Sequence, residues 1–272
     1  NQQSPLPEKY NTLVVINQNS TNSIALGNYY SERRQIPPEN ILRIAWSGGN
    51  ISWNAAQFHT NLLQPLLQAI ATRGLSNQIH YVVLSMDIPY SSVADTFYNG
   101  TTSALFYGLR SNSAPSLQML TNSYFAKEAN YPDAKPAATF GYSFLTTMIT
   151  ANTLAQAKLI VDHGVDSDGT FPTAPVHLAK SSDPLRRIRY TSYDNVVFNT
   201  RLRGNYQVVR TNSSSPYGLS GLLGYQTGLM NYSISPNTFV PGAMDDSLTS
   251  YGGVIFGNND QTSLLGFLNA GA

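Results

Sequence analysis

The 272-residue chain contains no cysteine and few charged side chains. The absence of cysteine excludes disulfide bonds, thiolate metal sites and cysteine nucleophiles. Charged residues make up 11% of the chain, against about 25% in typical globular proteins, and the net charge is +1. Because no Lys/Arg cluster is present, we expect no binding to nucleic acid. The apolar runs are shorter than the ~20 residues that a spanning helix requires, so we expect no membrane span.

The composition is instead polar and rich in aromatic residues. Hydrophobic residues make up 42% of the chain and aromatic residues 11%, which is enough for a sizeable core and argues against disorder. We associate a neutral polar surface of this kind with exported proteins. The chain begins at Asn1 without a methionine, which indicates that an N-terminal segment was removed, by signal-peptide cleavage or by trimming. We therefore expect a secreted or periplasmic protein.

Short apolar runs of strand length alternate with stretches of helical periodicity. The expected strands are 13–16, 41–44, 79–85, 143–148, 175–179, 206–210 and 219–227. The expected helices are 20–36, 54–73, 153–163 and 185–202, and the segment 261–269 has one apolar face. This alternation makes βαβ units, and it predicts an α/β fold with a mostly parallel, doubly wound sheet and helices on both faces. We expect a single domain over residues 1–272, with an irregular, aromatic-rich insertion at 90–142 after the third strand.

Polar residues follow several of the expected strands. In an open parallel sheet, ligands bind beyond the carboxyl ends of the strands. We expect the late polar loop 241–253 to face the same edge. The candidate ligand-binding residues are Asn17, Asn19, Ser20, Trp46, Trp53, Tyr90, Thr249 and Ser250.

The usual catalytic signatures are missing from this edge. We expect His59 inside a helix and His163 at the end of one. We expect His80 at the amino end of a strand and His177 inside a strand. None of these positions is at the carboxyl edge, so a Ser-His-Asp arrangement is hard to assemble. There is no nucleophile elbow, no phosphate-binding Gly-Lys loop and no dinucleotide fingerprint, and no cofactor is identified.

Four aspartates are the candidate catalytic residues: Asp87, Asp183, Asp245 and Asp246. Paired carboxylates can serve as acid and base without histidine. Asp87, Asp183 and Asp246 are also candidate ligands for a divalent cation, provided that they converge. The alternative for the group is helix capping and loop hydrogen bonding, and Asp183, directly before Pro184, is placed as such a cap.

Aromatic side chains favour a different kind of site. Both tryptophans flank one strand-to-helix loop, and the insertion adds further rings. These are Phe97, Tyr98, Phe106, Tyr107, Tyr124, Phe125 and Tyr131. Flat rings beside Asn and Asp suit a neutral polar ligand such as a glycan or a peptide. The alternative is that an insertion of this kind needs aromatic residues to build a small core of its own.

Four stretches carry a resemblance to a known family: NTLVVINQNS (11–20), RQIPPENI (34–41), YVVLSMDIPY (81–90) and PGAMDDSLTSYGG (241–253). They resemble an uncharacterised bacterial family of conserved hypothetical exported proteins, and the similarity spans nearly the whole chain. The resemblance implies no established activity. Members usually continue past the final Ala-Gly-Ala, so we expect this chain to be a fragment.

More distantly, the order of elements is similar to the caspase-like α/β fold of gingipain-type cysteine peptidases. Those enzymes place a His and a Cys after successive central strands. The third expected strand here ends in Met86-Asp87-Ile88-Pro89, and the chain has no cysteine. The peptidase chemistry is therefore not expected to carry over.

Three functions remain open at this stage. The first is a non-catalytic binding module for a polar small molecule, a glycan or a protein. The second is a carboxylate-based hydrolase that uses a divalent cation or none, and the third is a structural role at the cell surface or in assembly. A fold class does not separate these functions, because function depends on the site.

Overall fold

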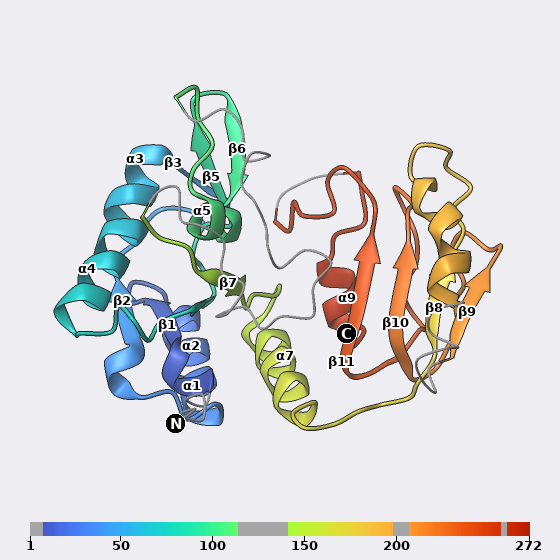
Figure 1. Ribbon diagram of the computed structural model, residues 1–272, viewed down its shortest axis with the longest axis horizontal. Coiled ribbons are helices and arrows are strands. Elements are labelled where there is room, and N and C mark those ends of the chain that lie inside the picture. The colour runs from blue at the N-terminus through green and yellow to red at the C-terminus, as the bar shows by residue number, and fades with distance from the viewer. Residues whose placement is uncertain (1–7, 114–140, 198–206, 257–259) are drawn as a thin grey trace. The chain divides into compact units, whose positions relative to one another are not determined.

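The computed structural model describes residues 8–113, 141–197, 207–256 and 260–272. The chain divides into two compact units, residues 1–150 and 151–272, although the sequence predicted a single domain. Each unit contains a four-stranded sheet in which all paired strands are parallel, and helices flank these sheets (Figure 1). The predicted α/β class, with parallel sheets and a doubly wound arrangement, is confirmed. No helix among the described residues combines the length and the apolarity needed to cross a membrane.

The first sheet has the strand order β2-β1-β4-β7. Its strands are β1 (Thr12–Asn17), β2 (Ile41–Ile44), β4 (Tyr81–Leu84) and β7 (Leu145–Met148). Every residue of β1 is buried, since the strand lies inside the sheet and is covered on both faces. In register, Val14 lies beside Ile41 on one side and Val83 on the other. The continuous apolar run of β1 is what a parallel strand buried on both faces requires.

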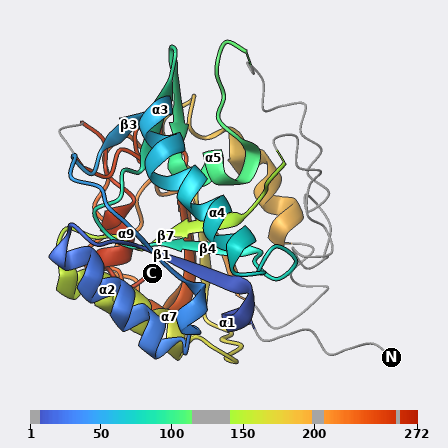
Figure 2. The ribbon, with the colours of Figure 1, turned by 90° about the vertical axis from the view of Figure 1, so that its left-hand side faces the viewer.

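Helices cover opposite faces of this sheet. Val14 and Ile16 pack against Ile24 and Tyr30 of α2 (Thr21–Arg33), which follows β1. Leu13 and Val15 face the other cluster, which includes the helical segment between β2 and β4. Figure 2 shows α2 and α4 (Gln64–Thr72) on opposite sides of the strands. Because β2 and β4 flank β1, the chain reverses its direction of winding there, which defines the topological switch point.

The predicted helix 54–73 forms as three consecutive segments. These are α3 (Ala55–Phe58), the π-helical turn η2 (His59–Leu63) and α4. Asn54 and Gln57 form a reciprocal capping box at the start. Pro65 lacks the N–H that an α-helix would use, and the predicted kink takes the form of the π-helical turn just before it.

Part of the predicted insertion 90–142 has regular structure. Strands β3 (Ser52–Asn54), β5 (Ser91–Ala94) and β6 (Phe97–Gly100) form a small sheet, and β5 and β6 pair as a hairpin. Helix α5 (Thr101–Tyr107) follows directly. The remaining short elements of this unit are α1 (Glu8–Asn11) and η1 (Pro38–Asn40). Residues 114–140 lie outside the described part of the chain, and so do the predicted roles of Tyr124, Phe125 and Tyr131.

The second unit has the strand order β11-β10-β8-β9. Its strands are β8 (Val176–Ala179), β9 (Val208–Thr211), β10 (Leu222–Thr227) and β11 (Phe239–Ser247). Helix α7 (Leu154–Asp166) starts at Thr153, whose side chain accepts a hydrogen bond from the Gln156 N–H. Helix α9 (Leu265–Asn269) packs through Phe267 onto a cluster that contains Leu222 and Tyr225.

One prediction for this unit is wrong, and another is confirmed in part. The first half of the predicted loop 241–253 belongs to the edge strand β11. This strand pairs with β10 at Phe239 and again from Met244, and Pro241 and Gly242 (φ 84) lie in the irregular stretch between. Of the predicted helix 185–202, residues 184–186 form a turn, Ile188–Ser192 form the 3-10 helix η3 and 193–197 are helical, while 198–202 lie outside the described part of the chain.

Candidate functional site

The carboxyl edge of the first sheet carries a polar pocket with a volume of about 480 Å³. It lies at the switch point, and residues from 17–22 and 46–50 line it together with Asp87. Four of the predicted ligand-binding residues gather there: Asn17, Asn19, Ser20 and Trp46. The sequence analysis missed Thr21, Asn22, Ser47 and Asn50, which lie on the same two loops. The rule that ligands bind beyond the carboxyl ends of parallel strands therefore led to residues that line a pocket.

Asn17, the last residue of β1, holds the loops of this pocket together. Its side chain is 2% exposed and joins three stretches of backbone. Its Oδ1 accepts hydrogen bonds from the N–H of Trp46 at 3.0 Å and of Asn19 at 3.2 Å. Its Nδ2 donates to the carbonyl oxygens of Trp46 at 3.0 Å and of Asp87 at 3.1 Å. Asn17 therefore shapes the pocket and has little hydrogen-bonding capacity left for a ligand.

Asp87 stands beside the start of helix α2. Its φ of 57° lies in the left-handed region, which asparagine and aspartate tolerate better than most residues. The Ser20 hydroxyl donates to Asp87 Oδ2 at 2.5 Å and accepts from the Ser23 N–H at 3.0 Å. Among the described residues, Ser20 is the one group that donates a hydrogen bond to this carboxylate. The other carboxylate oxygen is therefore available to a ligand.

Trp46 forms a wall of the pocket. Its indole N–H donates to the Gly49 carbonyl at 2.8 Å, and its ring meets Trp53 edge to face at 5.5 Å. A Cβ atom on Gly48 would lie 2.2 Å from the Trp46 ring, so a glycine is needed for this loop to fold onto the indole. Trp46 is half-buried, which leaves part of the ring accessible to a ligand.

Two predicted ligand-binding residues of this unit do not line the pocket. Trp53 is 1% exposed, and its indole N–H donates to Ser92 at 2.8 Å inside the core. The prediction that Trp53 offers a ring to a ligand is therefore wrong, since the small β3-β5-β6 sheet encloses it. Tyr90 is also not among the residues that line this pocket.

The remaining candidates belong to the second unit. Thr249 follows β11, lines a separate pocket there and donates a hydrogen bond to Gln261. Ser250 is exposed and does not line that pocket. The single ligand surface that the sequence analysis expected is thus divided between two sites on two units.

Asp183 stabilises a turn at 184–186 and does not cap a helix, so it has the loop hydrogen bonding that the sequence analysis gave as an alternative. Its Oδ1 accepts from the N–H groups of Leu185 at 2.9 Å and Arg186 at 3.3 Å, and its Oδ2 pairs with the Arg186 guanidinium. The hydrogen bond from the Arg186 side chain is the main cause that lowers the pKa of Asp183. A carboxylate engaged in this way is a poor candidate for general acid–base catalysis.

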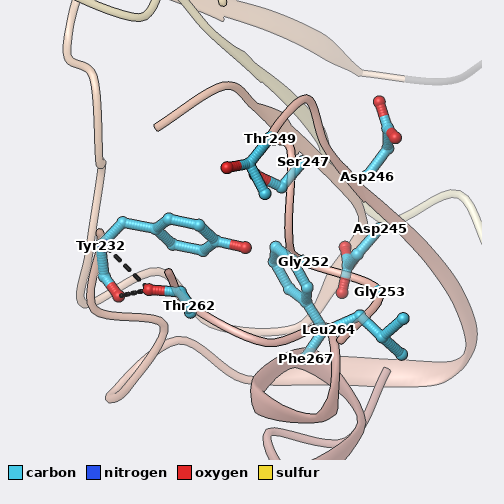
Figure 3. Close-up of a pocket in the computed structure, with 10 residues that line it drawn as sticks. All are labelled: Tyr232, Asp245, Asp246, Ser247, Thr249, Gly252, Gly253, Thr262, Leu264 and Phe267. Atoms are coloured by element: carbon cyan, nitrogen blue, oxygen red, sulfur yellow. Dashed lines mark hydrogen bonds between the residues drawn. The ribbon is translucent and has the colours of Figure 1, made fainter. Parts of the chain in front are cut away.

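Asp245 and Asp246 have contrasting surroundings although they are adjacent on β11. Asp246 pairs with Arg189 and accepts from the Gln226 amide at 3.0 Å. Both carboxylate oxygens of Asp245 are shielded from solvent and have no side-chain hydrogen-bond partner among the described residues, although the backbone N–H of Tyr225 acts to lower its pKa. Burial raises the pKa of Asp245 to about 7. Successive side chains of a strand point to opposite faces, and Figure 3 shows these two carboxylates turned away from each other.

Within each unit, no three His, Cys, Asp or Glu side chains among the described residues gather closely enough to hold a metal ion. Asp87 belongs to the first unit and Asp183 and Asp246 belong to the second, so their convergence stays a prediction. Asp183 forms an ion pair with Arg186, and Asp246 forms one with Arg189. Asp87 accepts a hydrogen bond from Ser20.

The pocket of the second unit has a volume of about 260 Å³. Most of its side chains were not predicted, namely Tyr232, Ser247, Thr262, Leu264 and Phe267. Ser247 is the last residue of β11, and the other four come from loops and from the short helix α9, to which the rule for strand ends does not apply. The Thr262 hydroxyl ties two of these loops by accepting from the Tyr232 N–H at 3.1 Å and donating to the Tyr232 carbonyl at 3.2 Å (Figure 3).

The histidines stay outside both pockets. His177 lies on β8 in register with Tyr225 of β10, and burial lowers its pKa. Comparisons with protein-family models, curated proteins and solved structures gave no match for this chain. A function can therefore be inferred only from the geometry and chemistry of its sites.

Proposed function

We propose that this chain is an exported binding protein that holds a neutral, hydroxyl-rich ligand such as a glycan in the pocket of its first unit. The observation that carries the proposal is the arrangement of Asp87. Its left-handed backbone and its bond from Ser20 hold a carboxylate at an open pocket. Backbone conformations of this kind cost ~1–3 kcal/mol and are concentrated at functional sites.

The chemistry of the lining favours a neutral ligand. Asp87 is the one charged residue among the described residues that line this pocket, so an anion would meet repulsion and no cationic partner. The N-terminus of α2, which would otherwise attract an anion, already faces the Asp87 carboxylate through Ser20. A sugar ring presents hydroxyl donors to a carboxylate and a flat apolar face to an indole.

Tryptophan fluorescence tests the proposal. Trp46 is half-buried at the pocket, whereas Trp53 is 1% exposed in the core, so a bound sugar should change the emission of Trp46. We expect a saturable change on titration with malto-, cello- or chito-oligosaccharides. The Trp46→Phe variant should lose this change.

A pair of aspartate variants sharpens the test. We expect Asp87→Asn to weaken binding about tenfold, corresponding to ~1.4 kcal/mol. Asp95→Asn is the matched control, because Asp95 also has a positive φ, of 53°, but lies in the β5–β6 hairpin. Equal affinities of the two variants, or no response to any of the oligosaccharides, would contradict a glycan site at Asp87.

The hydrolase alternative has one supporting observation, which is the raised pKa of Asp245. A paired-carboxylate mechanism needs a second acid on the same side. The adjacent Asp246 is turned to the other side of β11 and is paired with Arg189. We therefore rank binding above hydrolysis.

A further inference from the structure

The pocket of the second unit combines aromatic and apolar side chains with hydroxyl groups and two adjacent acids, Asp245 and Asp246. The rings of Tyr232 and Phe267 have centroids 5.5 Å apart, and Leu264 adds an apolar side. Figure 3 shows the Tyr232 hydroxyl and the Asp245 carboxylate directed toward each other from either side of the Phe267 ring. The pocket is built by the second unit alone.

The Asp245 carboxylate lacks the partner that burial demands. Both of its oxygens are shielded from solvent, and no side chain among the described residues donates a hydrogen bond to them; the backbone N–H of Tyr225 is the one group that favours the ionised form. Moving an ionised carboxylate away from water is costly unless it gains a counter-ion or a proton. The nearest arginine contact on this strand, from Arg189, is made to Asp246.

The surroundings of Asp245 suit an organic cation better than a metal ion. Divalent metals in proteins take several oxygen ligands, and no three acidic or histidine side chains gather among the residues that the structure describes. A primary ammonium has three donors, which the carboxylate and the hydroxyls of Tyr232 and Ser247 can accept. A cation near aromatic faces is stabilised further.

We propose that this pocket binds a small primary alkylammonium compound, with Asp245 as its counter-ion and the rings of Tyr232 and Phe267 as its walls. This site lies on a different unit from the glycan site and does not depend on it. An experiment that contradicts one of the two proposals therefore does not contradict the other.

Binding of this kind has a defined pH dependence. The titratable groups near Asp245 are Tyr225 and Tyr232, whose pKa values burial raises to about 12, so both stay neutral. Asp246 is paired with Arg189, and His177 lies beyond Tyr225 in the strand register. Because burial raises the pKa of Asp245 to about 7, its carboxyl group is mostly protonated below that pH, and an ammonium ion binds there only when this proton is released. The dissociation constant should therefore be roughly thirtyfold higher at pH 5.5 than at pH 8.

The experiment is a calorimetric titration of the full chain with n-butylammonium chloride at pH 8 and at pH 5.5. The neutral isostere 1-butanol and sodium chloride at equal ionic strength serve as controls. We expect saturable binding of n-butylammonium at pH 8, the roughly thirtyfold weakening at pH 5.5, and no binding of 1-butanol. Equal responses to the amine and the alcohol, or binding of the amine that is independent of pH, would overturn the proposal.

The variant Asp245→Asn removes the charge and keeps the shape of the side chain. It should lose n-butylammonium binding at pH 8. The control Asp194→Asn removes the same charge from a pair with Arg210 on the surface of this unit, and it should bind as the unmodified chain does. Retention of binding by Asp245→Asn would also overturn the proposal. The titration of the unmodified chain at two pH values decides the question without any variant.

Discussion

Asp245 and Asp246 show how much the surroundings of a residue decide its chemistry. Asp246 has an arginine and an amide as partners. Asp245 has no side-chain hydrogen-bond partner among the described residues, and burial raises its pKa to about 7. The sequence places both in one polar run and cannot tell them apart, because the difference arises from the alternation of the strand and from α9 packing over one face.

The raised pKa of Asp245 makes stability depend on pH. An unfolded aspartate titrates near 3.8 and the folded one near 7, so the folded state binds more protons between these values. Stability should therefore fall as pH rises from about 4 to about 7. At ~1.4 kcal/mol per pKa unit, reduced for solvent screening, the loss is roughly 2 kcal/mol.

The variant Asp245→Asn tests this dependence. Asparagine resembles the protonated acid at every pH, so we expect a gain of roughly 2 kcal/mol at pH 8 and little change at pH 4. Urea unfolding at the two pH values measures the difference. A variant that is destabilised equally at both would show that the carboxylate makes a favourable contact in the folded state.

Individual residues differ in how well the sequence predicts them. Asn17 follows a buried strand, and its place at the edge was predictable, but its four hydrogen bonds to three loops were not. Trp53 is near Trp46 in the chain, which suggested a shared surface. The small sheet that buries Trp53 depends on pairing with β5, and pairing between distant strands is not encoded in local periodicity.

At the scale of elements, helix α2 illustrates a cap with two roles. Ser20 accepts from the Ser23 N–H and also donates to the charged Asp87, whereas Thr153 at the start of α7 accepts from the Gln156 N–H and donates to the neutral Gln156 side chain. Loss of a cap alone costs ~1 kcal/mol. A hydrogen bond to a charged group contributes a further ~1.5–3 kcal/mol.

We therefore expect Ser20→Ala to destabilise its unit by roughly 3 kcal/mol and Thr153→Ala by roughly 1 kcal/mol. Chemical denaturation of each variant gives the two values. Equal losses would mean that the contact between Ser20 and Asp87 adds nothing to stability.

Elements with continuous apolar runs were predicted well, and edge elements were not. The strands β1, β2 and β4 were located within a few residues, because burial on both faces leaves a clear apolar signal. Strand β11 was predicted as a loop, since Pro241 and Gly242 are turn residues. An edge strand tolerates them because one of its sides has no ladder to maintain.

At the scale of the whole molecule, each unit has its own core and its own pocket. We expect two calorimetric unfolding transitions, because separate cores allow separate cooperative units. Asp245 belongs to the second unit, so a change from pH 5 to pH 8 should lower one transition and leave the other nearly unchanged. A single transition that shifts as a whole would show that the two units unfold together.

The burial of β1 on both faces has a consequence for motion. Its amides should exchange with deuterated solvent more slowly than most others in the first unit, because opening them requires the loss of both flanking helix layers. The floor of the first pocket is the end of this strand, while its walls are exposed loops. A ligand would therefore meet a fixed base that holds Asn17 and a rim that adjusts to it on a faster timescale.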